Sequence, residues 1–151
     1  MPTMFDRWLV AGAAPAIEAA LASIAPARSG AVAVIGDARL ARALASRGRA
    51  VTLSGVDAAA TKKLPPTVTI TDALPDRSAT AVIGCGAGER DDWEAVLETW
   101  SRAVVDGGGL VLVDRAPAIE LSRRALCAGL SALEQRVAGR WLVTSGLVSD
   151  L

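Results

Sequence analysis

Few residues of this chain are of a type that does chemistry, and most of those follow short apolar runs. The chain contains no histidine and no tyrosine, which removes the commonest general base and a common phenolic acid. Without a histidine, Cys85 cannot form a Cys–His nucleophile pair. No cluster of Cys, Asp and Glu has the spacing of a metal site. The sequence therefore names no catalytic residue and predicts no metal.

The remaining candidates are acidic residues and glycines at the ends of apolar runs. Ligands of open α/β sheets bind at the carboxyl ends of the strands, where the winding of the sheet reverses. Residues that follow a strand are therefore the ones to consider for binding. In chain order they are Gly36-Asp37, Gly55 to Asp57, Asp72-Ala73, Gly84 to Gly88 and Asp114.

Hydrophobic patterning predicts strands that alternate with helices from Gly30 onward. Continuous apolar, β-branched runs are typical of strands buried on both faces, and they predict strands at 31–35, 50–53, 68–71, 80–83 and 110–113. Helices are expected at 37–47, with Asp37 as its N-cap, at 58–64, from 91 to about 104, and from Pro117. The third of these begins at a capping box of Asp91 and Glu94, and the turn Gly107 to Gly109 follows it.

Side-chain spacing also predicts which helical residues face the core. The expected apolar positions are Trp93, Val96, Leu97, Trp100 and Val104 in the third helix, and Ile119, Leu126 and Leu130 in the fourth. The tail should form two strands, 131–137 and 141–148, joined so tightly that only an antiparallel hairpin is possible. Residues 1–29 should form two short helices that cap a sheet edge, with the spacings Phe5, Trp8, Leu9 and Ile17, Leu21, Ile24.

The stretch Thr67 to Arg115 carries a family resemblance. It combines Asp-Ala-Leu-Pro after a strand, a helix striped with Trp, Leu and Val, and Gly-Gly before a further strand. This order resembles the class I S-adenosylmethionine (SAM) methyltransferase family, over roughly Gly30 to Leu151. The resemblance implies a Rossmann-like, doubly wound α/β fold: a mostly parallel seven-stranded sheet closed by an antiparallel C-terminal hairpin strand. The chain would then be one domain, 30–151, with the N-terminal helices of 1–29 packed on it.

The resemblance also implies where SAM would be bound. The family's first loop is rich in glycine so that backbone can approach the cofactor, but only Gly36, followed by Asp37, is present here. The acid that grips the ribose falls at Gly55, and Asp57 lies two residues beyond. Asp72, followed by Ala73, matches the acid that accepts the adenine amino group, and Gly84 opens the loop that forms the cleft floor.

Each of these positions also has a plain structural interpretation. Gly36 could simply turn a strand into a helix, Asp57 could cap the helix that follows it, and Asp72 could be an ordinary turn former. The Gly84 to Gly88 run is similar to a dinucleotide fingerprint, but the next strand-ending acid, Asp114, is thirty residues on, against the roughly twenty of that motif. An NAD-type domain is therefore the weakest interpretation.

Composition excludes several partners. Sixteen basic and sixteen acidic residues cancel, so nucleic acid and anionic membranes are not expected partners. The two cysteines form no CxxC pair, no apolar run could span a membrane, and no cationic leader precedes the alanine-rich start. These features favour the cytoplasm.

Two interpretations of function remain. The first is a degenerate methyltransferase-like domain without catalysis that acts through protein contacts or self-association as a homodimer. The second is an active small SAM-dependent methyltransferase acting on a small molecule or protein side chain. Four tryptophans in so small a chain, Trp8, Trp93, Trp100 and Trp141, are compatible with an interface, although core packing also explains them.

Overall fold

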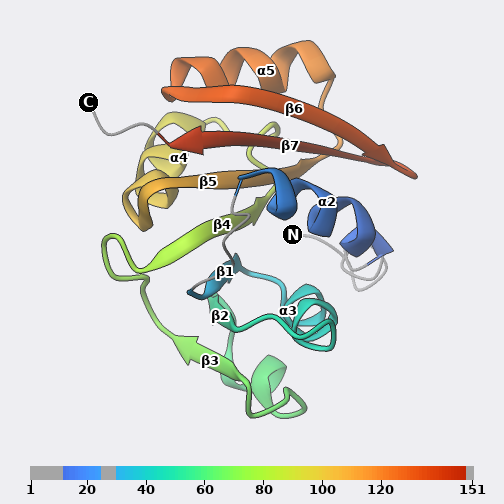
Figure 1. Cartoon of the computed structure of the whole chain (residues 1–151), viewed down its shortest axis with the longest axis vertical. Helices are drawn as coiled ribbons and strands as arrows, with labels where there is room; N and C mark the ends of the chain where they lie inside the picture. Colours follow the sequence, from blue (N-terminus) through green and yellow to red (C-terminus); the bar gives the residue numbers. More distant parts are fainter. Residues whose placement is uncertain (1–11, 25–29, 149–151) are drawn as a thin grey trace.

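The computed structural model describes residues 12–24 and 30–148, which form one seven-stranded sheet with helices on both faces (Figure 1). The strands are β1 (Val32–Ile35), β2 (Val51–Ser54), β3 (Val68–Thr71), β4 (Ala79–Cys85), β5 (Val104–Asp114), β6 (Leu130–Ala138) and β7 (Trp141–Val148). The helices are α2 (Ala14–Ile24), α3 (Ala38–Ala45), α4 (Trp93–Arg102) and α5 (Ala118–Cys127), with a 3₁₀ turn, η1, at Ala58–Thr61.

The order of the strands confirms the predicted doubly wound sheet. It is β3-β2-β1-β4-β5-β7-β6, with β1 to β5 parallel and β7 antiparallel between β5 and β6. The winding reverses between β1 and β4, as expected. The hairpin from β6 to β7 is also confirmed, because Ala138 pairs with Trp141 and leaves a two-residue turn in which Gly139 has φ +61°.

The two faces of the sheet bury separate cores. Helices α2 and α3 cover one face, and α4 and α5 cover the other (Figure 1). Successive residues of β5 supply both cores, since Val111 lies in the first and Leu110 in the second. The spacing of Ile17, Leu21 and Ile24 is confirmed, because all three are buried.

The expected position of the N-terminal helices at a sheet edge is wrong for α2. This helix packs across the face formed by β5 and β7, where its apolar side can be fully buried. Phe5, Trp8 and Leu9 lie outside the described residues.

Three of the expected helices are shorter than predicted. Helix α3 ends at Ala45 rather than Arg47, before the positive φ of Gly48. The segment expected as a helix at 58–64 forms only the turn η1. The capping box of Asp91 and Glu94 is wrong: α4 starts at Trp93 after Asp92, whose carboxylate binds Arg90 instead of capping the helix.

Gly107 to Gly109 form part of β5 and not the expected turn. The pairing of β4 with β5 shifts from Ala79–Val104 to Ala81–Gly109, so the intervening residues bulge. A Cβ on Gly108 would overlap the carbonyl oxygen of Thr80, and one on Gly109 would lie 2.5 Å from the carbonyl oxygen of Gly146. Neighbouring backbones approach too closely here for any larger residue.

The phase of α5 also differs from the expectation. Ile119 and Leu126 are 85% and 60% exposed, whereas Leu121 and Ala125 are buried. Arg124 lies on the inner side, where its Nη1 donates to the carbonyl oxygens of Ala87 and Arg90. These contacts lie on the same side of α5 as the buried Leu121 and Ala125. Leu130 is buried as expected, but as the first residue of β6.

Candidate functional site

Open space lies beside two glycines at the point where the winding of the sheet reverses. Gly36 follows β1 with φ +75°, and Gly86 follows β4 with φ +81°. A Cβ on either glycine would have no heavy atom within 4 Å. Gly55 lies beside this point, because a Cβ on it would be 3.5 Å from the amide nitrogen of Gly36. This is the edge at which α/β sheets bind ligands.

Two of the predicted binding acids serve as helix caps. Asp37 is 4% exposed, and its Oδ1 accepts a hydrogen bond from the amide of Leu40 at 2.9 Å. Asp57 Oδ1 accepts from the amide of Ala60 at 3.0 Å, at the start of η1. Asx side chains satisfy the unpaired first amides of a helix in this way. Asp57 therefore caps the element that follows it, as its structural interpretation predicted.

Asp72 and Ala73 lie exposed at the end of β3. Their backbone is held by neighbouring hydroxyls: Ser54 Oγ donates to the carbonyl oxygen of Asp72 at 3.2 Å, and Thr71 Oγ1 donates to that of Ala73 at 2.9 Å. Because Ser54 ends β2, its hydrogen bond ties the end of β2 to the loop after β3. The carboxylate of Asp72 thus stands on a fixed backbone at the same edge of the sheet as Gly36.

The sequence suggested that Gly84 opens the loop after β4. The structure corrects this, because Gly84 lies inside β4. It is buried, and a Cβ on it would overlap the indole ring of Trp100 from α4. Its lack of a side chain is explained by this packing. The loop begins two residues later, at Gly86.

Cys85 is the last residue of β4 and lies among carboxylates. Burial, together with the negative charges of Asp37 and Asp114, raises the pKa of its thiol to about 12. A thiol with this pKa stays protonated at neutral pH and is a poor nucleophile. Cys85 and Cys127 are both free, so no disulfide links them.

Asp114 is a buried ionisable residue. From the sequence it was identifiable only as the acid at the end of a strand. It is 1% exposed, and its Oδ2 accepts a hydrogen bond from the amide of Gly88 at 2.9 Å. Its Oδ1 is buried without a hydrogen-bond partner. Burial raises its pKa to about 6, against the opposing effect of the Gly88 hydrogen bond. An acid directly after a fully apolar strand was the available signal for such a residue.

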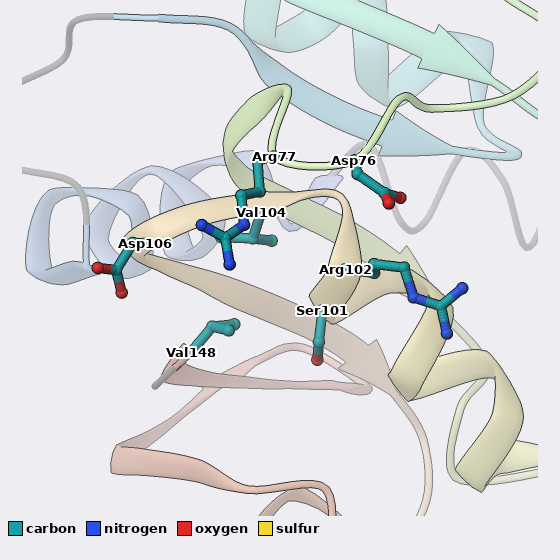
Figure 2. Close-up of a pocket in the computed structure, with 7 residues that line it drawn as sticks. All are labelled: Asp76, Arg77, Ser101, Arg102, Val104, Asp106 and Val148. Carbon is teal, nitrogen blue, oxygen red and sulfur yellow. The ribbon is translucent and has the colours of Figure 1, made fainter. Parts of the chain in front are cut away.

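Two hollows are lined by none of Gly36, Asp72 and Gly86. One, of about 610 Å³, is lined by residues of α3 and the segment around η1. The other, of about 270 Å³, lies at the opposite edge of the sheet, near the starts of β4 and β5 (Figure 2). In Figure 2, the charged side chains of the second hollow point apart and do not converge on one centre. They belong to Asp76, Arg77, Arg102 and Asp106.

Two other kinds of feature are absent from residues 12–24 and 30–148. No three His, Cys, Asp or Glu residues there are grouped so as to hold a metal ion. No helix of those segments has the length and apolar character needed to cross a membrane.

The same fold occurs in solved SAM-dependent methyltransferases. A predicted O-methyltransferase from Agrobacterium tumefaciens is similar with a TM-score of 0.63 and 18% identity, over 80% of this chain and 74% of that one. A TehB-like SAM-dependent methyltransferase from Corynebacterium glutamicum gives 0.66 and 20%, over 92% and 88%. Human N-acetylserotonin methyltransferase in complex with SAM gives 0.70 and 15%, over 95% and 53%.

This chain therefore spans about half of the human enzyme and most of the two bacterial proteins. No protein-family model and no curated protein matches the sequence. At these identities the comparisons establish architecture, because one fold supports many activities. The chain has the fold of the class I SAM-dependent methyltransferases.

Proposed function

We propose that this chain is a methyltransferase-fold domain that has lost its hold on SAM and works through protein contacts or self-association. The observation that carries this proposal is that no carboxylate is available at the position where the family's acid would bind the ribose of SAM. Gly55 has no side chain to offer there, and Asp57 Oδ1 is bonded to the amide of Ala60. A carboxylate used as a cap is not positioned to grip two hydroxyl groups.

The groups near the glycine loop support the same proposal. Asp37 is buried as the cap of α3, and Cys85 is a protonated thiol at neutral pH. Neither is suited to act as a base or nucleophile on a substrate. Methyl transfer depends largely on holding donor and acceptor in line, so loss of the cofactor grip would remove the main source of catalysis.

Exposed apolar side chains support the protein-contact part of the proposal. Ile119 and Leu126 of α5, together with Val137 of β6, are 60–85% exposed. Strand β6 and the start of α5 are in contact, because Gln135 Nε2 donates to the carbonyl oxygen of Ala118. By contrast, Trp100 and Trp141 are buried and belong to the core.

An active methyltransferase is the second candidate, and the adenine side of the cleft favours it. Asp72 and Ala73 are exposed at the end of β3, and the space beside Gly36 and Gly86 is open. Together with Asp37 and Asp57, these residues are the positions that would lie near SAM, whereas Gly84 is packed inside β4 against Trp100.

Calorimetry with SAM and with its demethylated product separates the two candidates. We expect no saturable heat at millimolar ligand. Micromolar binding that Asp72→Ala abolishes, and that Asp106→Ala at the opposite edge leaves intact, would contradict the degenerate interpretation and favour the enzyme.

Sedimentation velocity tests self-association separately. We expect a concentration-dependent dimer that Ile119→Ser or Val137→Ser weakens. A strict monomer at high protein concentration would count against self-association and would leave contact with a different protein as the remaining form of the proposal.

A further inference from the structure

The 610 Å³ hollow beside α3 gathers positive charge. Four long basic side chains line it, and its other lining residues are alanines, which leave room between the charges. The basic residues are Arg39, Arg42, Lys62 and Lys63, and the alanines are Ala38, Ala59 and Ala60. No acidic residue is among these lining residues. The hollow is therefore both concave and electropositive, in a chain whose total charge is zero.

Other basic residues of the chain are neutralised by ion pairs with acidic side chains, but in the part of the chain that the structure describes three of the four that line the hollow are not. The chain has two basic pairs, and in the pair Arg123-Arg124 both guanidinium groups bind Glu120. Within the described residues, Lys62 and Lys63 form no ion pair, nor does Arg39. Like charges held together without a counter-charge repel one another, and an anion bound between them would remove that cost.

The local structure ties the lysine segment to α3, and the two acids nearest in sequence are helix caps. Arg42 Nη2 donates to the carbonyl oxygen of Lys63 at 2.9 Å, which ties the lysine segment to α3. The acids that precede the two elements, Asp37 and Asp57, accept hydrogen bonds from the amides of Leu40 and Ala60. Both acids are thus engaged at the starts of α3 and η1.

We propose that this hollow binds a small anion that carries phosphate, such as a pyrophosphate group or a phosphorylated metabolite. Arginine matches phosphate oxygens with a planar fork of donors, and lysine adds a mobile point charge. Several cations around one space favour an anion with more than one negative charge. The volume falls within the range of about 300–1,000 Å³ that is usual for small-molecule sites.

This site is independent of the proposed loss of SAM binding. Its ligand contacts are side chains of α3 and of the segment after η1, whereas Asp72 and the glycines at the winding reversal would contact SAM. Binding at the hollow would give the domain a small-molecule input even without catalysis.

Isothermal titration with inorganic pyrophosphate at low ionic strength tests the proposal, because salt screens exposed charges. We expect one saturable site. Arg39→Gln and Lys62→Gln should each weaken it at least threefold, and together at least tenfold, since each removes one charge–phosphate contact. Arg42 is left intact because it also bonds to the Lys63 carbonyl.

Arg140→Gln is the matched control. Arg140 is an exposed arginine in the hairpin turn between β6 and β7 and does not line the hollow. This variant should bind pyrophosphate as the unmodified chain does. Thermal unfolding of the variants should show no loss of stability, because the substituted side chains are exposed and removing a like charge relieves repulsion.

Absence of heat with millimolar pyrophosphate would overturn the proposal, and so would equal binding by all variants. A single-stranded oligonucleotide that binds the same residues more than a hundredfold tighter than pyrophosphate would also overturn it, since the occupant would then be a nucleic acid. Asp72→Ala should leave pyrophosphate binding unchanged, so failure of this site and failure of the proposed function have different signatures.

Discussion

The indole ring of Trp100 lies directly against Gly84, so that any Cβ at position 84 would overlap its six-membered ring. Strand β4 and helix α4 approach each other closely at this contact, and both residues are buried. A glycine that the sequence suggested for a cofactor loop thus has a packing role in one core. The chemistry of the winding reversal begins beyond it, at Gly86.

Gly84→Ala should destabilise the fold by about 1–3 kcal/mol, because the added methyl group must displace a large ring in a filled core. Urea unfolding measures the loss. In a Trp100→Leu background the same substitution should cost clearly less, since the smaller side chain leaves room. Equal costs in the two backgrounds would show that the ring is not what excludes a side chain at position 84.

Asp114 should make stability fall as the pH rises through its titration. Its pKa is about 6 in the folded chain and near 3.8 without burial, so the folded state binds more protons between these values. Unfolding free energy then decreases from about pH 4 to about pH 6 and stays lower above that. Asp114→Asn lacks this component, and its stability relative to the unmodified chain should rise with pH by of the order of 1–3 kcal/mol.

Denaturant unfolding at pH 4, 5, 6 and 7.5 measures that difference, with the exposed Asp106→Asn as a control. A difference between Asp114→Asn and the unmodified chain that does not change with pH would contradict the raised pKa of Asp114.

The two cysteines should differ sharply in reactivity. Cys127 is exposed, whereas the pKa of Cys85 is raised to about 12 by burial and by two neighbouring carboxylates. Because the thiolate is the reactive form, Cys85 should react with an aromatic disulfide reagent at pH 8 at least about a hundredfold more slowly than Cys127. The native Cys127→Ser variant should show no fast reaction. After denaturation, its one remaining thiol, Cys85, should react quickly and release one equivalent of the aromatic thiolate per chain. A fast phase in native Cys127→Ser would refute the burial argument.

The ion pair between Arg49 and Glu18 should contribute more than the exposed pairs. Arg49 Nε lies 2.8 Å from both carboxylate oxygens, and the two side chains are only 12% and 23% exposed. Arg49→Ala would leave Glu18 half-buried without its partner, so we expect a loss of about 1–3 kcal/mol.

The matched control is Arg102→Ala, which removes an exposed pair with Glu98. Its cost in the same urea-unfolding experiment should be below about 0.5 kcal/mol. Similar losses for the two variants would mean that burial does not strengthen the Arg49 pair.

Much of the architecture was predictable because it depends on local pattern. The runs at 31–35 and 68–71, rich in apolar and β-branched residues, have the composition of strands, and the tight link around Gly139 permits only a hairpin. The spacing of Ile17, Leu21 and Ile24 correctly predicted their burial on one face of α2. All of these predictions depend on residues that are near one another in the sequence.

The errors arose where contacts between distant segments decide the outcome. Gly107 to Gly109 were expected to turn the chain, but the approach of Thr80 and Gly146 makes them part of β5. Ile119 and Leu126 have helical spacing, yet α5 packs with Leu121 and Ala125 inward and with Arg124 bonded to the loop after β4, which leaves both exposed.

Sequence alone determined the fold class and the shortage of catalytic groups, because strand periodicity, glycine placement and residue types are local properties. Only the tertiary structure decided that Asp114 is buried beside Cys85 and that Lys62-Lys63 lines one hollow with Arg39 and Arg42, with no acidic lining residue among those of 12–24 and 30–148. Burial and charge depend on which segments pack together. A neutral total charge and a short basic pair cannot reveal that four cations converge on one hollow.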